Sequence, residues 1–176
     1  AHAAARALAM HGDLDTPAET ARQVDFLFVA DHAFPVGDRA LRANDVLGLM
    51  RQGAFSAERI VEDLVTGLTR AVERHPRVVL THLFGNLSRI GVDDSEVPVA
   101  SVERLALAAA SRGALLEVNE RYRAPSVRIC RIFHRLGVPL VASSDAQSPA
   151  AVGRFSYVDE VFSAVGASPV PVPVRR

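Results

Sequence analysis

The chain alternates short apolar runs with longer segments in which apolar residues recur every three or four positions. The short runs have the length and composition of buried strands. They cover residues 26–30, 78–80, 115–119 and 138–142. The longer segments have the spacing of amphipathic helices, and they cover residues 56–74, 101–112, 125–136 and 149–165. This alternation predicts an α/β fold whose parallel strands are joined by helical crossovers.

The first of these helices has the clearest pattern. Ser56 is a favourable N-cap residue, and Pro76 cannot continue a helix. Between them, seven apolar residues form one stripe: Ile60, Val61, Leu64, Val65, Leu68, Ala71 and Val72. The opposite face carries charged residues, which indicates that it faces water. The preceding segment, 38–53, has a looser helical spacing that Gly48 interrupts, so its structure stays open at this point.

The two ends of the chain differ from its middle. Residues 1–10 are rich in alanine and predict a weak helix or a frayed strand, and a capping box at 16–19 predicts the start of a short helix. Residues 169–176 alternate Val and Pro, which cannot pair on both sides as a strand and predicts disorder. We therefore expect one domain over residues 1–166, followed by a tail over residues 167–176.

Polar side chains appear where three of the predicted strands end. These ends read Asp31-His32, Thr81-His82 and Ser144-Asp145. Because the carboxyl ends of parallel strands lie on one face of a sheet, we expect His32, His82 and Asp145 to converge there. Two imidazoles and a carboxylate are a plausible ligand set for zinc, manganese or iron. The alternative is structural: hydrogen-bonded histidines and an Asp145 that caps the following helix.

Other polar residues give weaker signals. Glu117 lies inside its predicted strand, where a role as partner of a neighbouring arginine or backbone amide is favoured. Arg89 could bind a phosphate or carboxylate group. His134 lies in the middle of a helix pattern beside another charged residue and is expected to face water. Cys130 falls in an amphipathic helix pattern and is expected to be a buried small hydrophobe.

The composition of the chain limits the classes of function that the protein can have. The chain has 20 basic and 20 acidic residues, so no global field points to nucleic acid as a partner. No run approaches the ~20 apolar residues of a membrane span. A single cysteine excludes a disulfide framework, and the first residues, which start without Met, lack a secretory pattern, so we expect a cytoplasmic protein. That start resembles a cut, so we expect either that an N-terminal segment lies outside this chain or that the domain is a degenerate one.

Four stretches, in order, resemble the PHP (polymerase and histidinol phosphatase) family. Its last motif usually reads Ser-Asp-Ala-His after an apolar run, and residues 138–147 are similar to it. Residues 115–126 resemble the family strand with Glu-Val-Asn, and residues 78–91 resemble the strand that ends in a metal-binding histidine. The remaining stretch, residues 12–35, resembles a Leu-Asp turn, short helix and strand. These read VPLVASSDAQ, LLEVNERYRAPS, VVLTHLFGNLSRIG and GDLDTPAETARQVDFLFVADHAFP.

The resemblance implies a distorted (β/α)7 barrel of TIM-like type with a trinuclear metal centre that hydrolyses phosphate esters. By match, His32 and His82 would bind one metal ion together with a glutamate, and Asp145 would bind another. The metal ions would polarise the phosphoryl oxygen and generate a hydroxide nucleophile. The implied partner is a small phosphorylated substrate, with histidinol phosphate among the candidates.

The chain also departs from the family pattern. Nothing matches the family's first strand, His-X-His, and its early glutamate has no counterpart in residues 1–10. Gln147 stands where the last motif has a histidine, and a neutral amide oxygen suits a hard cation better than zinc. The barrel is therefore expected to be incomplete at its N-terminus, with an exposed sheet edge that favours self-association or poor solubility.

Three hypotheses about function follow. The first is a metal-dependent phosphoesterase of PHP type. The second is a degenerate, non-catalytic PHP-like module used for binding or structure, and the third is an unrelated barrel hydrolase of the amidohydrolase kind. Because several family ligands are absent, we expect the chain to bind at most one divalent ion and to turn over generic phosphate monoesters little. We expect Gln147 and Arg89 to contact the metal site or the substrate.

Overall fold

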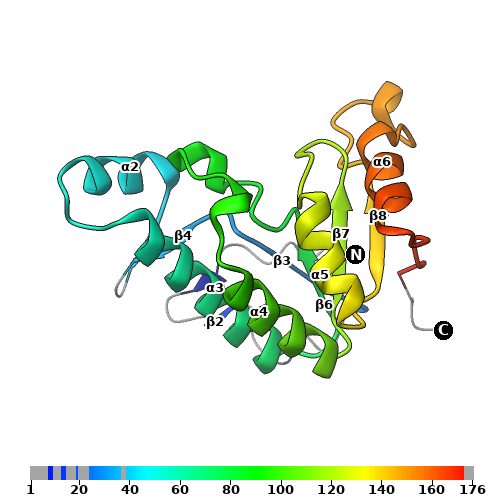
Figure 1. The fold of residues 1–176 in the computed structure, drawn as a ribbon, viewed down its shortest axis with the longest axis horizontal. Helices are drawn as coiled ribbons and strands as arrows, with labels where there is room; N and C mark the ends of the chain where they lie inside the picture. Colours follow the sequence, from blue (N-terminus) through cyan, green and yellow to red (C-terminus); the bar gives the residue numbers. More distant parts are fainter. Residues whose placement is uncertain (1–7, 10–12, 15–18, 20–23, 37–38, 173–176) are drawn as a thin grey trace.

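A computed structural model describes residues 8–9, 13–14, 19, 24–36 and 39–172. Its centre is a sheet of four parallel strands in the order β3, β6, β7, β8 (Figure 1). The strands are β3 (Leu27–Ala30), β6 (Val78–Thr81), β7 (Leu115–Asn119) and β8 (Leu140–Ser143). Every strand therefore has its carboxyl end at the same edge of the sheet, as the alternation of strands and helices predicts.

Helices follow the strands in the chain; α3 to α6 cover one side of the sheet, and α2 lies away from it (Figure 1). They are α2 (Ala43–Arg51), α3 (Ala57–Arg74), α4 (Val99–Ser111), α5 (Val127–Arg135) and α6 (Ser156–Val165). The hydroxyl of Ser56 accepts a hydrogen bond from the Arg59 amide, which is the predicted cap of α3. The seven predicted stripe residues of α3 are all buried, so this stripe supplies much of the core.

Alternate residues of the strands point to opposite faces of the sheet. One set joins the main core under the helices, as Leu80, Leu116 and Leu140 do. The other set forms a small separate cluster of Val79, Leu115 and Val141, against which two phenylalanines pack. At the carboxyl end of the sheet this second face becomes polar, and the candidate site lies there.

Short elements connect the sheet to the helices. A hairpin of β4 (Phe34–Val36) and β5 (Arg39–Leu41) leads into α2, and β1 (Leu8–Ala9) pairs with β2 (Asp13–Leu14). Single 3₁₀ turns are η2 (Leu87–Ile90), η3 (Asp94–Glu96) and η4 (Pro149–Ala151). The segment left open by the sequence pattern, 38–53, therefore contains the strand β5 and the helix α2 within its described residues. Gly48 stays helical there, and a Cβ at this position would meet no neighbouring atom.

Three expectations need correction or qualification. The TIM-like barrel, which was expected to be incomplete, is not confirmed: the described sheet is open, and its two edges, β3 and β8, do not pair with each other. The helix predicted over 149–165 is divided, since Gly153 adopts a φ of +73° after η4 and α6 begins only at Ser156. In the tail, the Val170 amide donates a hydrogen bond to the Leu140 carbonyl at the edge of the sheet. None of the described helices is long and apolar enough to cross a membrane.

Candidate functional site

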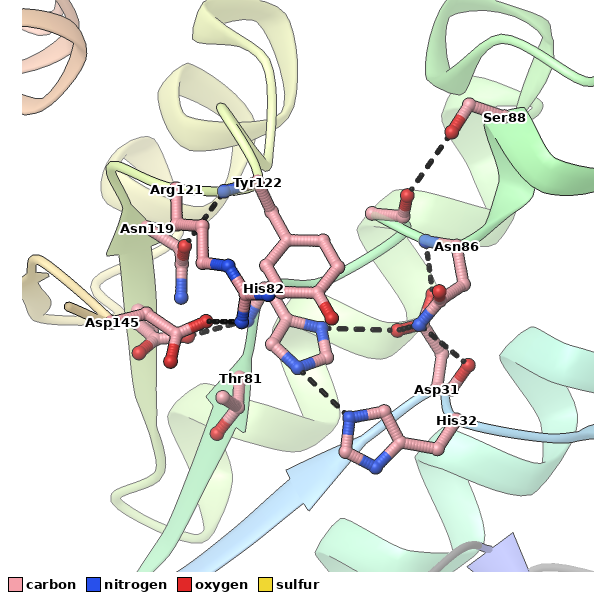
Figure 2. A network of polar contacts seen from close by, with 12 residues as sticks. Asp31, His32, Thr81, His82, Asn86, Ser88, Asn119, Arg121, Tyr122 and Asp145 are labelled. Carbon is pink, nitrogen blue, oxygen red and sulfur yellow. Dashed lines mark hydrogen bonds and ion pairs between the residues drawn. The ribbon is translucent and has the colours of Figure 1, made fainter. Parts of the chain in front are cut away.

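His32 and His82 lie side by side at the carboxyl ends of β3 and β6, which are neighbours in the sheet (Figure 2). Their Nε2 atoms are 3.2 Å apart, and their ring centroids are 5.0 Å apart. This is a hydrogen-bond distance if one Nε2 carries a proton. It is also close to the spacing of two nitrogen ligands in a tetrahedral metal site, which is about 3.3 Å when each bond is about 2.0 Å.

Asp31 lies behind His82 and is almost completely buried, with 1% of its surface exposed. Its Oδ1 is 3.3 Å from Nδ1 of His82, an electrostatic contact that is not aligned as a hydrogen bond. Asn86 donates to the same carboxylate from its backbone amide and from its side chain. A carboxylate in this position favours the tautomer with the proton on Nδ1, which leaves the Nε2 lone pair of His82 directed at His32.

Glu117 fixes the backbone of the same histidine. Its Oε2 accepts a hydrogen bond of 2.6 Å from the His82 amide, and its side chain is buried in β7. The sequence pattern favours a role as partner of an arginine or of a backbone amide, and the structure shows the second. His82 has a φ of +35°, a left-handed conformation that is uncommon for residues other than glycine. The buried carboxylate therefore stabilises the turn that directs the His82 ring toward His32.

The two histidines have opposite electrostatic environments. Burial disfavours the charged form of His82, but the carboxylates of Asp31 and Glu117 outweigh this effect and raise the pKa of His82. Burial and then the charge of His82 lower the pKa of His32. His32 is therefore the ring that loses its proton first as the pH rises. A pair made of one neutral imidazole and one imidazole in contact with a carboxylate can share one proton or hold one cation between the two rings.

Asp145 lines the same cavity as both histidines, and this cavity has a volume of about 610 Å³. The structure thus brings the three predicted ligands to one place. Asp145 follows β8 in a left-handed conformation, with a φ of +44°. One of its oxygens lies 3.5 Å from the guanidinium of Arg121 (Figure 2). The side-chain amide of Gln147 contacts the other oxygen at 3.5 Å. The carboxylate is therefore held by a cation of the chain itself.

The donor set fits a metal ion in part. The two Nε2 atoms are suitably spaced for two coordination positions, and both face one cavity. Among the described residues, however, no group of three His, Cys, Asp or Glu side chains is arranged to hold a metal ion. Asp145 shares the cavity but pairs with Arg121 in this structure.

Two residues of the site carry no signal in the strand pattern. Tyr122 stacks on the ring of His82 with a centroid distance of 4.3 Å and an angle of 20° between the planes. Arg121 precedes it, with its guanidinium 5.5 Å from the same tyrosine ring. Both lie in the loop just after β7. The strand-end rule that identifies His32 and His82 would find them if it were extended to the third residue beyond each strand.

A second cavity, of about 390 Å³, adjoins the first. His32 and Tyr122 line both cavities. The other side chains of the second cavity come from the hairpin, from the start of α2 and from the loop and 3₁₀ turn after β6. They are Phe34, Arg42, Ala43, Asn44, Asn86 and Arg89. Arg89 therefore shares a cavity with His32 but does not line the cavity that contains Asp145.

No family model matches the chain, and no curated protein matches its sequence. A solved structure does match the fold: histidinol phosphate phosphatase (HISK) from Lactococcus lactis subsp. lactis Il1403, complexed with zinc, L-histidinol and phosphate. The TM-score is 0.52 at 15% sequence identity, and the match covers 83% of this chain. The two share a fold. The match covers 58% of the phosphatase chain, which is less than two thirds of its length.

Proposed function

We propose that the larger cavity binds and hydrolyses small phosphate esters with the help of one divalent metal ion held by His32 and His82. The observation that carries the proposal is the 3.2 Å separation of the two Nε2 atoms, one of them backed by a buried carboxylate. The order of the PHP-like motifs supports it, and so does the solved structure of similar fold, which contains zinc and phosphate. Zinc, manganese and iron all suit imidazole ligands.

Each residue of the site has a role in this proposal. His32 and His82 bind the ion, Asp31 and Glu117 hold His82 in place, and Asp145 is the candidate third ligand. Arg121 is half exposed at the cavity and 3.5 Å from Asp145, so it can exchange this partner for an anionic phosphate. When bound, the metal ion would supply a Lewis acid for the phosphoryl oxygen and an activated water molecule.

A second candidate is a PHP-like module that binds phosphate esters without hydrolysing them. The pairing of Asp145 with Arg121 favours it, as does Gln147 in the place of a family histidine. In this case the histidine pair would hold one weakly bound ion or none.

Elemental analysis of the purified protein, combined with a phosphate-release assay on a panel of small phosphate esters with added Mn²⁺ or Zn²⁺, tests the proposal. We expect about one metal ion per chain and turnover that the substitution His82→Ala abolishes. His134→Ala is the matched control, because His134 is exposed on α5. One bound ion without turnover supports the binding module. A chain that neither retains metal nor releases phosphate contradicts the enzymatic proposal.

A further inference from the structure

The second cavity offers space for the part of a ligand that is not bound at the histidine pair. His32 and Tyr122 form walls of both cavities, so a molecule held near the Nε2 atoms can extend directly into the second one. Its volume of about 390 Å³ suits a compact organic group. Under the proposed function, this group is the leaving alcohol of the phosphate ester.

Two arginines give the second cavity its charge. Arg42 immediately precedes α2, and Arg89 lies in η2, so two separate parts of the chain bring them to one cavity. Both are exposed, and neither side chain makes a hydrogen bond or ion pair with another residue in the described part of the chain. Their guanidinium groups are therefore available to an anion, for which their planar pairs of N–H donors are well suited.

Nothing in the lining of this cavity balances the two positive charges. None of the described residues that line it is acidic. Asp45 is close in sequence, but it lines a different cavity, together with Gly48 and Gln52. Asp31 is buried behind Asn86, whose side-chain amide donates to it. A cation entering the second cavity would thus meet like charge, whereas an anion would find two partners.

Apart from Ala43, the other side chains that line the second cavity are aromatic or carry an amide. Phe34 and Tyr122 supply flat apolar surface, and Asn44 is an exposed amide at the start of α2. This combination suits a short carbon skeleton with a polar end. It contrasts with the chemistry of L-histidinol, the compound in the solved structure of similar fold, because an amino alcohol carries a positive charge at neutral pH.

We infer that the substrate is a phosphate ester whose organic part carries a second anionic group, a carboxylate or a second phosphate, bound by Arg42 and Arg89. This inference rests on the proposed function for the position of the first phosphate. It adds the substrate class: phosphorylated hydroxy acids or bisphosphates, and not phosphorylated amino alcohols. It also gives a reason to expect slow turnover of generic monoesters, which lack the second anionic group.

Three esters of similar size and different charge test the inference: 3-phosphoglycerate, glycerol 3-phosphate and phosphoethanolamine. The Mn²⁺-supplemented protein is assayed for kcat/KM with each ester, and binding of each is measured by titration calorimetry. We expect 3-phosphoglycerate to be preferred over phosphoethanolamine by about tenfold or more, as two exposed charge contacts allow. Higher salt should reduce this preference, because the two arginines are exposed.

The double variant Arg42→Gln/Arg89→Gln should lose the preference, so that kcat/KM and affinity for 3-phosphoglycerate fall to about those for glycerol 3-phosphate. Arg112→Gln is the control, since Arg112 is an exposed arginine at the end of α4 and should keep the full preference. Thermal unfolding followed by circular dichroism verifies that each variant is folded.

Equal kcat/KM and equal affinity for the three esters would overturn the inference, and so would a preference that persists in the double variant. Absence of turnover with all three esters would instead count against the proposed hydrolysis. In that case the calorimetric affinities alone decide the inference, with tighter binding of 3-phosphoglycerate than of phosphoethanolamine as the supporting result.

Discussion

Asp31→Asn is the substitution that probes the histidine pair most directly. It preserves the size of the side chain and removes the negative charge 3.3 Å from Nδ1 of His82. Without the carboxylate, His82 is no longer held in the tautomer whose Nε2 lone pair faces His32. We therefore expect the affinity for Zn²⁺ or Mn²⁺ to fall.

The size of the effect can be bounded from the contacts. Loss of a carboxylate that orients a metal-binding histidine typically costs 10–100-fold in metal affinity, or about 1.4–2.7 kcal/mol. A separate cost falls on folding, because Asp31 accepts from both the amide and the side chain of Asn86 in a buried position. An asparagine presents an NH₂ group to one of these donors, which should lower the free energy of unfolding by about 1–3 kcal/mol.

Titration calorimetry of the metal-free protein gives the affinity, and denaturant unfolding followed by circular dichroism gives the stability. The metal affinity and the stability are both measured under conditions in which the variant is folded. Asp63→Asn is the control, since Asp63 pairs with Arg59 on the surface of α3 and should leave metal affinity unchanged. A folded Asp31→Asn variant that binds metal as tightly as the unsubstituted chain would refute the proposed role of Asp31.

Three further predictions concern α6, the thiol and the last motif. Glu120 accepts hydrogen bonds from Ser156 and from two backbone amides at the start of α6. These hydrogen bonds outweigh the effect of burial and lower the pKa of Glu120. Its contribution to stability is therefore complete above the ordinary glutamate pKa of 4.5 and is lost as the pH falls through the lowered pKa. Glu120→Gln should therefore destabilise the fold by about 1 kcal/mol at pH 7 and by less in acid, in urea titrations at both pH values. Burial raises the pKa of Cys130 to about 12, so its reaction with a disulfide reagent should follow global unfolding; rapid reaction of the native thiol would show that α5 opens locally. Gln147→His should raise the metal content measured by elemental analysis without producing turnover of generic monoesters, and unchanged metal content would show that residue 147 does not reach the ion.

The apolar pattern predicts the sheet well because each strand is buried. The run at 115–119 coincides with β7, and the stripe after Ser56 coincides with α3. The discrepancies come from single residues. Pro139 accepts a hydrogen bond from Leu116 through its carbonyl but has no N–H to donate, and β8 begins one residue later, at Leu140. Pairing between the two edges of the sheet is a long-range property that local periodicity does not contain. Only the resemblance pointed to a barrel, and the departures from the family pattern pointed to an incomplete one.

The residues of the candidate site also fall into a part that the sequence predicts and a part that it does not. Strand ends indicate His32, His82 and Asp145, because parallel strands bring their carboxyl ends together and the side chains there are polar. The pattern does not indicate that Arg121 pairs with Asp145, or that Arg42 and Arg89 share a cavity. These contacts depend on loop conformations, which have no periodic signature in the sequence. The role of Asp31 depends on the orientation of the His82 ring, which is fixed by a backbone turn with positive φ.

The stacking of Tyr122 on His82 has an optical consequence. The chain has no tryptophan and only two tyrosines, so tyrosine emission is not masked. One of them lies 4.3 Å from the ring of His82, whereas Tyr157 is buried with its hydroxyl bonded to the Pro125 carbonyl. An ion or proton that changes the charge of His82 alters the quenching of its stacked neighbour. The unmodified protein thus contains its own fluorophore that reports the charge of the histidine pair. The substitution Tyr122→Phe removes this fluorophore and serves as the control.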